Sequence, residues 1–367
     1  MKFLVTPAKG EIRRLLGLGL EERAARMLAF AGVQAADAPV GQGPLVIYPG
    51  ERVGPGALGK EIAAIDPIDG EVIALSGGPS GPQGRPVLLV GGGLRQTLLA
   101  GTTTAEDAYG RALTVAGAPR SLSALTDSVT DRVSKARAKT MLLRALRKPI
   151  DGLVSRTLNR PVSIAVSSLV VETPLTPNQM SVICFVLALG AAALMVAQQF
   201  IAGALLMHVS SVLDGCDGEV ARLKYQSSKL GGWLDTIFDD ISNNTFALCT
   251  GIGLYFQHAS PFGTVLLVMA ATGFVLTIPI VAATYRRLIR AGTSDSGQLD
   301  WSGGDTGAGW RRFVTSYLAP LVKRDAYLFV FLILAIIQVP EAIAILYSIG
   351  AMVAAYTMLS GSARNDA

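Results

Sequence analysis

Residues 173–213 read TPLTPNQMSVICFVLALGAAALMVAQQFIAGALLMHVSSVL, and these 41 residues contain no Asp, Glu, Lys or Arg. Two later stretches have the same character: the 45 residues of Ile241–Tyr285 carry no charge, and the 38 residues of Ala326–Ala363 carry only Glu341. A helix needs about 20 apolar residues to cross a bilayer. Each stretch is therefore long enough for roughly two passes, and the sequence predicts a multi-pass α-helical membrane protein.

We expect six transmembrane helices in this half of the chain. They are predicted at 178–197, 201–224, 229–255, 262–285, 326–339 and 342–360. The turns near Gln198, 257–262 and Pro340 contain no Lys or Arg. The opposite turns carry Arg222, Lys224 and Lys229, then Arg286, Arg287 and Arg290, then Arg311, Arg312, Lys323 and Arg324. By the positive-inside rule, both termini and the basic turns lie on the cytoplasmic side of an inner membrane.

The composition agrees with a membrane protein. Half of the 367 residues are hydrophobic and only 16% are charged, whereas soluble domains carry about a quarter of charged residues. The formal net charge is +5, yet aromatic residues make up only 7% of the chain. A nucleic-acid binder would show a basic stripe interleaved with aromatics. The basic excess therefore points to a membrane surface and its lipids as partners, and not to nucleic acid.

The first 131 residues have a different pattern. Short apolar runs at Lys2–Thr6, Pro44–Tyr48, Glu71–Leu75 and Pro86–Val90 read as strands, and Glu11–Gly32 reads as an amphipathic helix. Strands that alternate with helices are typical of an α/β domain. We expect residues 1–131 to form a soluble α/β domain in the cytoplasm.

A basic segment, residues 132–172, separates this domain from the helical domain, residues 173–367. The span Arg132–Arg160 holds nine Lys or Arg residues and a single acid, Asp151. Leucines and isoleucines recur in it at helical spacing, with breaks at Pro149 and Gly152. This pattern predicts a basic amphipathic segment that lies on the cytoplasmic leaflet.

Acidic residues interrupt the apolar helices at two places. At 100° per residue, the helix predicted over 201–224 presents Asp214, Asp217 and Arg222 on one face, with Gly218 and Ala221 leaving space beside them. Charged side chains within membrane helices are costly, and they usually mark a functional site.

The next predicted helix carries the matching acids. Gly231, Asp235 and Asp239 share one face, whereas Asp240 points about 100° away. Because a short turn at Tyr225–Ser228 makes the two helices antiparallel, the four facing carboxylates should meet. Four unpaired carboxylates would repel one another, so the cluster suits one or two hard cations, Mg²⁺ or Mn²⁺. Intramembrane carboxylates also serve ion-coupled transporters, which remain the alternative, although transport requires neither Arg222 nor the glycines.

The spacing Asp214-x2-Asp217-Gly218-x2-Ala221-Arg222-x8-Gly231-x3-Asp235-x3-Asp239 resembles the full signature of the CDP-alcohol phosphotransferase family. The resemblance implies six transmembrane helices, a homodimer, and transfer of a phosphate-linked alcohol from a CDP-alcohol to a hydroxyl acceptor with release of CMP. Carried over by position, the four aspartates are metal ligands and Asp239 is also the general base. The resemblance also implies that the nucleotide is bound by Asp217, Gly218, Ala221, Arg222 and Gly231.

The resemblance leaves the substrates open. The donor is either CDP-diacylglycerol or a soluble CDP-alcohol, and the acceptor is an alcohol or alcohol phosphate. The stretches Lys148–Arg160 and Thr176–Asn178 are similar to family members that carry a fused cytoplasmic domain, which favours inositol phosphate-type chemistry. Basic residues near the cytoplasmic mouth serve either the acceptor phosphate or lipid headgroups. They are Lys148, Arg156, Arg160, Arg286 and Arg287.

Within the N-terminal domain, Leu15–Glu22 and Ala31–Val33 resemble an early helix of sugar nucleotidyltransferases. The Gly-rich, Arg-containing phosphate loop that should precede it is replaced by Pro7-Ala8-Lys9-Gly10. Gly91–Gly93 follow a predicted strand and are more typical of a turn than of a phosphate cradle. We therefore expect a degenerate, non-catalytic nucleotidyltransferase-like domain.

Overall fold

The computed structural model describes residues 1–9, 11–67, 71–76, 85–122, 127–147, 154–258, 260–293 and 324–365, with side chains to residue 356. The chain is divided into two compact units. The N-terminal unit comprises Met1–Lys148, Ser167–Pro174 and Glu219–Gln226, and the helical unit comprises Pro149–Val166, Leu175–Gly218 and Ser227–Ala367. One of the boundaries between them falls inside the long helix α8 (Phe200–Lys224), so this helix belongs to both units.

The N-terminal unit is built on a six-stranded mixed sheet with strand order β4-β1-β5-β8-β7-β9. Its strands are β1 (Lys2–Thr6), β4 (Gln34–Ala35), β5 (Leu45–Pro49), β7 (Val72–Ser76), β8 (Val87–Val90) and β9 (Arg120–Ser121). Strand β8 is antiparallel to both of its neighbours, and the other pairs are parallel. The α/β class and the four predicted strands are confirmed, each strand to within one residue.

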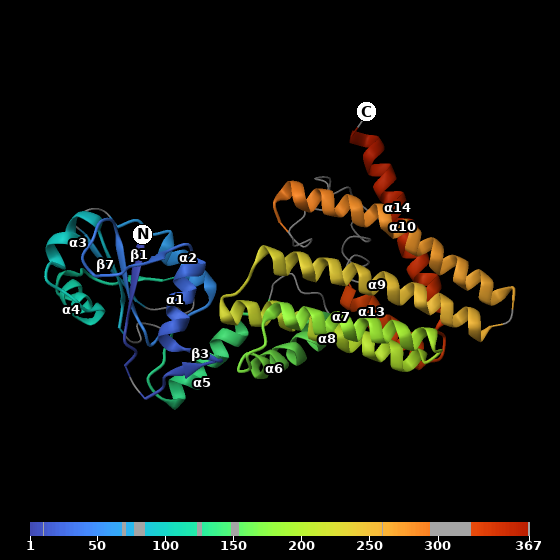
Figure 1. The fold of residues 1–367 in the computed structure, drawn as a ribbon, viewed down its shortest axis with the longest axis horizontal. Helices are drawn as coiled ribbons and strands as arrows, with labels where there is room; N and C mark the ends of the chain where they lie inside the picture. Colours follow the sequence, from blue (N-terminus) through green and yellow to red (C-terminus); the bar gives the residue numbers. More distant parts are fainter. Residues whose placement is uncertain are drawn as a thin grey trace. The chain divides into compact units, whose positions relative to one another are not determined.

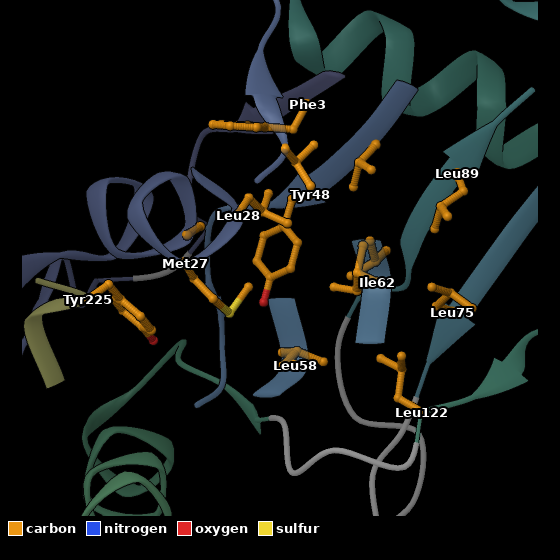
Figure 2. Close-up of a cluster of buried hydrophobic side chains, with 14 of the residues drawn as sticks. Phe3, Met27, Leu28, Tyr48, Leu58, Ile62, Leu75, Leu89, Leu122 and Tyr225 are labelled. Atoms are coloured by element: carbon orange, nitrogen blue, oxygen red, sulfur yellow. The ribbon is translucent and has the colours of Figure 1, made fainter. Parts of the chain in front are cut away.

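Helices cover both faces of this sheet because its central strands are apolar on both sides. Val46 and Tyr48 of β5 pack with α1 (Leu20–Phe30) and α2 (Gly56–Ala63) on one face. Their neighbours in β5, Leu45 and Ile47, pack with α4 (Ala105–Val115) on the other. Figure 2 shows Tyr48 among the side chains of the first core. The two-residue period of a strand thus produces a three-layer arrangement.

The predicted helix over Glu11–Gly32 was wrong for its first part. Residues 14–19 form a hairpin of β2 (Arg14–Leu15) and β3 (Leu18–Gly19), and α1 begins only at Leu20. The turn between the strands places Leu16 and Gly17 at φ of 48° and 75°. Two consecutive left-handed residues cannot belong to a helix, and they form the tight turn that matches the twist of a hairpin.

Further short elements complete this unit and lead into the next. They are β6 (Arg52–Val53) paired with β10 (Asp127–Ser128), α3 (Gly92–Leu98), α5 (Arg132–Arg144), the π-helical turn η1 (Ser155–Asn159) and α6 (Arg160–Val170). Gly91 and the first residues of α3 form an ordinary helix start after β8. The predicted breaks at Pro149 and Gly152 lie outside the described residues.

Helices occur at all six positions predicted for the second half of the chain (Figure 1). They are α7 (Pro177–Val196), α8, α9 (Lys229–Gln257), α10 (Phe262–Ala291), α13 (Arg324–Ile336) and α14 (Glu341–Asn365). Among the described residues, α7, α8 and α10 are long and apolar enough to cross a membrane by length and composition. Helix α9 has the length, but acidic residues interrupt its apolar sequence.

Packing within the helical unit brings α9 to its centre. Helix α9 contacts α7 on one side and α10 on the other, and α14 packs against α10 and α9. Helix α8 packs on α7, where the Ser210 hydroxyl donates to the Cys184 carbonyl at 2.7 Å. A capping box of Thr176 and Gln179, with Pro177 in the first turn, fixes the start of α7. These contacts hold α8 and α9, the two acidic helices, in fixed register.

Candidate active site

Three of the four predicted aspartates meet between α8 and α9. Carboxylate oxygens of Asp214, Asp235 and Asp239 all lie within 4.8 Å of one another. Ser228 fixes the start of α9, because its hydroxyl accepts the Gly231 amide at 3.0 Å. The short turn before it reverses the chain and brings the two acidic faces together. Asp235 and Asp239 are four residues apart, so they lie on the same side of α9.

Arg324, at the start of α13, reaches this cluster. Its Nη1 lies 2.8 Å from Oδ2 of Asp214 and also contacts Oδ1 of Asp239. The Arg324 side chain is only 18% exposed, so the ion pairs are largely shielded from solvent. One guanidinium thus links the two acidic helices to a third element.

Asp217 lies on α8 but has different partners. Its carboxylate accepts hydrogen bonds from the Ser181 hydroxyl of α7 and from the Gly218 amide. It is 8% exposed and does not belong to the group of three converging carboxylates. Its role as a metal ligand stays a prediction.

The chemistry of the cluster fits a divalent cation. When ionised, three carboxylates outweigh the single charge of Arg324 by two units. In addition, Oδ1 of Asp235 is buried and has no hydrogen-bond partner in the described structure. A buried carboxylate oxygen without a partner is unfavourable, and a hard cation with oxygen ligands would satisfy it. Asp214, Asp235 and Asp239 are the residues that would hold such an ion.

A second polar network fixes α9 against its neighbours. The Tyr285 hydroxyl of α10 donates to Oδ2 of Asp240 at 2.8 Å. One turn further along α9, Oδ1 of Asn244 accepts the hydroxyls of Thr277, at 2.7 Å, and Tyr347, at 2.6 Å. Asp240 therefore faces α10 and lies outside the metal cluster, as the helical geometry predicted.

The predicted nucleotide-binding residues continue along α8 and the start of α9. Ala221 is buried, whereas Gly218, Arg222 and Gly231 are half-buried. Gly231 lies close to the start of α7, because a β-carbon at this position would lie 3.0 Å from Oδ1 of Asn178. A side chain at this position would press against Asn178, which would have to move by a few tenths of an ångström.

The described residues among the predicted acceptor contacts lie on three elements, η1, α6 and α10. Arg160 is half-buried on α6, and its Nη1 would lie 3.5 Å from a β-carbon at Gly215, the neighbour of Asp214. Arg156, on η1, is exposed. Arg286 and Arg287 are exposed on α10, and Lys148 lies outside the described residues.

Sequence reasoning missed two contacts of this site. The sequence indicates only that Arg324 lies on the cytoplasmic side, and not that it contacts the aspartates. It places Ser181 in an apolar helix, without a polar partner. The signal for Arg324 was its position directly before an apolar run, at the end of the helix expected on the cytoplasmic side. No pattern in the sequence pairs Ser181 with Asp217.

The N-terminal unit holds a polar cluster of its own, defined here as Lys9, Glu51, Arg85 and Glu106. Arg85 binds both carboxylate oxygens of Glu106 at 2.9 Å and lies 3.8 Å from Glu51, and Lys9 lies 3.0 Å from Glu106. Burial by itself raises the pKa of Glu106, but the hydrogen bonds and charges of Lys9 and Arg85 hold it below its ordinary value.

This cluster lies where β1 and β5 end and β8 begins. Ligands of open α/β sheets bind at the carboxyl ends of the parallel strands. Here the side chains at that edge already pair with one another, two acids with two bases.

Comparison with known proteins identifies the family of this chain. A sequence profile described as CDP-alcohol phosphatidyltransferase matches residues 174–359, just over half of the chain. A protein of Thermococcus kodakarensis named bifunctional IPC transferase and DIPP synthase is 46% identical over 111 residues, 30% of this chain and 25% of that protein. One of the same name from Aquifex aeolicus is 35% identical over 127 residues, 34% of this chain and 29% of that protein.

A shorter relative also matches. The archaetidylinositol phosphate synthase of Pyrococcus horikoshii is 33% identical over 79 residues, 22% of this chain and 42% of that protein. The chain spans about a quarter of the length of the bifunctional relatives. The profile and the converging aspartates give the same answer: this chain belongs to the CDP-alcohol phosphatidyltransferase family, whose members are membrane-integral enzymes that depend on divalent metal.

Proposed function

We propose that this chain transfers a phosphate-linked alcohol from a CDP-alcohol to a hydroxyl acceptor and releases CMP, in phospholipid or phosphodiester biosynthesis. The observation that carries the proposal is the convergence of Asp214, Asp235 and Asp239 to within 4.8 Å, with a buried, unpartnered oxygen on Asp235. A transporter would need no such match to the family profile over residues 174–359.

One or two Mg²⁺ or Mn²⁺ ions would be held by these three aspartates, with Asp217 as a fourth candidate. When bound, such ions neutralise the negative charge of the diphosphate and of the departing CMP. Arg222 lies on α8 beyond Asp217 and is suited to bind a phosphate oxygen. Gly218, Ala221 and Gly231 lack bulky side chains, as suits residues that line a nucleotide site.

The chemical step needs one general base. The acceptor hydroxyl gives its proton to the Asp239 carboxylate while its oxygen forms a bond to the β-phosphorus of the donor. The bond between the β-phosphorus and the bridging oxygen breaks, and CMP leaves with that oxygen. A direct displacement is favoured because Cys216, the nearest thiol in the motif, is buried and its thiol donates to the Ser163 carbonyl at 3.4 Å.

For the acceptor, we propose an inositol phosphate-type alcohol. Support comes from the names of relatives, one of which is an archaetidylinositol phosphate synthase. Arg160 is the best placed of the predicted phosphate ligands, since it lies beside Gly215 and thus close to Asp214 on α8. Replacing Lys148, Arg156, Arg160, Arg286 and Arg287 by Gln, one at a time, tests this assignment. If the acceptor KM is unchanged in all five, the basic residues serve lipid headgroups only.

We further propose six membrane spans, a homodimer, and an inner-membrane location with both termini and the active site in the cytoplasm. The six helices and the distribution of Lys and Arg support the spans and the orientation, and the homodimer is what the family resemblance implies. The self-paired cluster at the sheet edge supports a non-catalytic N-terminal domain. Synthesis of a CDP-alcohol from CTP by the purified protein would contradict that assignment.

The reaction is tested by CMP release. Purified protein in detergent is incubated with Mg²⁺, CDP-diacylglycerol and a panel of alcohols and alcohol phosphates, and CMP is quantified. We expect CMP with one class of acceptor, and at least about 10²-fold less CMP in Asp239→Asn. If CDP-diacylglycerol gives no CMP, soluble CDP-alcohols are tested next. Absence of CMP with every donor, together with no binding of CDP and metal, would refute the proposal.

A further inference from the structure

The turn that follows the aspartate motif on α8 has an unusual residue at its centre. The amides of Tyr225 and Gln226 donate to the carbonyls of Arg222, at 3.4 Å, and Ala221, at 2.8 Å. This pair of bonds closes the helix in a Schellman motif, in which the residue at the position of Tyr225 is left-handed and is usually glycine. Tyr225 has φ of 53°, so its β-carbon strains the backbone.

Two other described helices of the helical unit end in the same motif with a residue other than glycine at its centre. Gln198 after α7 and Gln338 after α13 have φ of 62° and 59°, and the same two amide bonds close each helix. Both glutamine side chains are exposed, whereas Tyr225 is only 9% exposed. The side chain of Tyr225 is therefore packed in the protein interior, whereas the two glutamine side chains are not.

The Tyr225 side chain packs in the core of the N-terminal unit. The Tyr225 ring is one of the buried side chains of the cluster that contains Met27 and Leu28, and Figure 2 shows it beside Met27. Its hydroxyl donates to the carbonyl of Gly54 at 2.5 Å. Ring and hydroxyl together fix the residue after α8 to a folded domain far away in the sequence.

Arg23 of α1 adds a second attachment. The residue is 1% exposed, and its guanidinium lies 5.6 Å from the centre of the Tyr225 ring. Nη1 donates to the Leu223 carbonyl at 2.9 Å, and Nη2 donates to the carbonyls of Leu15 and Leu16 at 2.9 and 3.1 Å. One buried cation thus joins the end of α8 to the β2–β3 hairpin.

The hairpin in turn contacts the end of α6. Gly17 has φ of 75°, and a β-carbon there would lie 2.1 Å from the Val171 carbonyl oxygen, so only glycine fits. Lys224 of α8 donates to the Thr173 carbonyl at 2.9 Å. The residues around the end of α8 are therefore held from several directions, all within the N-terminal unit.

We infer that Tyr225 and Arg23 are positioning residues for the donor nucleotide site. Ala221 and Arg222 lie in the segment Glu219–Gln226, which contains the end of α8 and forms one compact unit with the N-terminal domain. In the turn at Tyr225, the carbonyls that accept the two capping hydrogen bonds are those of Ala221 and Arg222. The N-terminal domain thus acts as a brace that sets the nucleotide-binding end of α8. This inference rests on the proposed function.

The test compares two left-handed turn residues in the full-length protein in detergent. Tyr225→Gly relieves the strained backbone but removes the anchor, and Gln198→Gly relieves the same strain where there is no anchor. We expect Tyr225→Gly to raise the Kd for CDP with Mg²⁺, and the donor KM, on the order of tenfold or more. The kcat at saturating donor should stay within about twofold of wild type. Gln198→Gly should bind CDP as wild type does.

A conservative variant guards against a merely unstable protein. Tyr225→Phe keeps the ring in the core and loses only the hydrogen bond to Gly54, so we expect an increase in the Kd of about threefold. Tyr109→Phe is its matched control, because the Tyr109 hydroxyl donates to the Pro86 carbonyl in the same unit, at 2.9 Å.

Either of two results overturns the brace: CDP binding as in wild type in Tyr225→Gly, or equal weakening in Tyr225→Phe and Tyr109→Phe. A wild-type protein that binds no CDP refutes the proposed function itself, and the brace with it.

Discussion

Two polar clusters in this protein contain similar side chains and differ in their balance of charge. In the N-terminal unit, Glu51 and Glu106 face Lys9 and Arg85, so acids and bases are equal in number. In the helical unit, Asp214, Asp235 and Asp239 face Arg324, so the described acids exceed the bases. The first cluster satisfies itself, whereas the second leaves negative charge and an unpartnered oxygen for a cation.

The difference indicates where chemistry takes place. Both clusters lie where a ligand is expected, one at the carboxyl edge of an α/β sheet and the other between apolar helices of a membrane-integral family. Unpaired charge in a shielded site is unfavourable unless a ligand compensates it. A neutral network at a sheet edge needs no ligand, and it stabilises the fold instead. The following experiments challenge this contrast, from the largest expected effect to the smallest.

Asp239→Asn should produce the largest loss. Without a general base, CMP release should fall by about 10²- to 10⁴-fold, while the Kd for CDP changes only a few-fold because Asn retains the size of the side chain. CMP release and CDP binding are measured in parallel. The control is Asp240→Asn, whose amide oxygen still accepts from Tyr285. Turnover that survives in Asp239→Asn would remove this residue from its role as base.

Asp235→Asn should weaken the metal site itself. Asp235 carries the unpartnered oxygen, so its loss should reduce Mn²⁺ affinity by about tenfold or more. Chelation of metal should abolish CMP release in the wild type. Mn²⁺ binding is measured by electron paramagnetic resonance. The matched change in the balanced cluster, Glu106→Gln, should leave it unchanged, and if both variants lose metal equally the contrast between the clusters is wrong.

Arg324→Gln should expose the repulsion among the aspartates. Removing one partner of a shielded ion pair costs about 3 kcal/mol, so the metal-free variant should unfold at a lower Tm than wild type. Because Mg²⁺ supplies the missing positive charge, the increase in Tm on adding Mg²⁺ should be larger in the variant. Arg324→Lys serves as the control that retains the charge. An equal Mg²⁺ effect in wild type and Arg324→Gln would mean that the guanidinium does not neutralise the cluster.

Glu106→Gln should have the smallest effect. Its ion pairs are partly exposed, so the stability of the N-terminal domain should fall by about 1 kcal/mol or less, with CMP release unchanged. The pKa of Glu106 is held below its ordinary value of 4.5, so its contribution is present above that value and is lost as the pH falls through the lowered pKa. The free energy of unfolding, measured between pH 3 and pH 7, should depend less on pH in the variant than in wild type. The same pH dependence in both proteins would show that the ion pairs of Glu106 do not contribute to stability.

Much of the helical unit could be predicted from the sequence. All six helices lie at the expected positions, and Asp214, Asp235 and Asp239 converge as their spacing requires. The rest depends on contacts between distant segments. Arg324 lies 33 residues after Ala291, the last residue of α10, and no helical period connects it to Asp214. Asp217 fits the same periodicity as Asp214, but the Ser181 hydroxyl on a neighbouring helix binds it instead.

The N-terminal region shows the opposite limit. Its longer strands could be predicted because each is a short apolar run that can be recognised from neighbouring residues alone. The hairpin of residues 14–19 was predicted wrongly as part of a helix. The hydrophobic pattern of those residues fits a helix, and the left-handed turn at Leu16 and Gly17 decides against it. That turn is held in place by contacts with residues 171 and 172.

The sequence by itself therefore determined the apolar helices, the sheet strands and the spacing of the aspartate motif, because all of these follow from the fixed rise and period of a single backbone element. Only the tertiary structure decided which charges meet. Arg324 enters the aspartate cluster, Asp217 turns to Ser181, and Tyr225 fills the core of the N-terminal unit. The physical reason is that such contacts depend on how separate elements pack, and packing is set by shape and burial over the whole molecule.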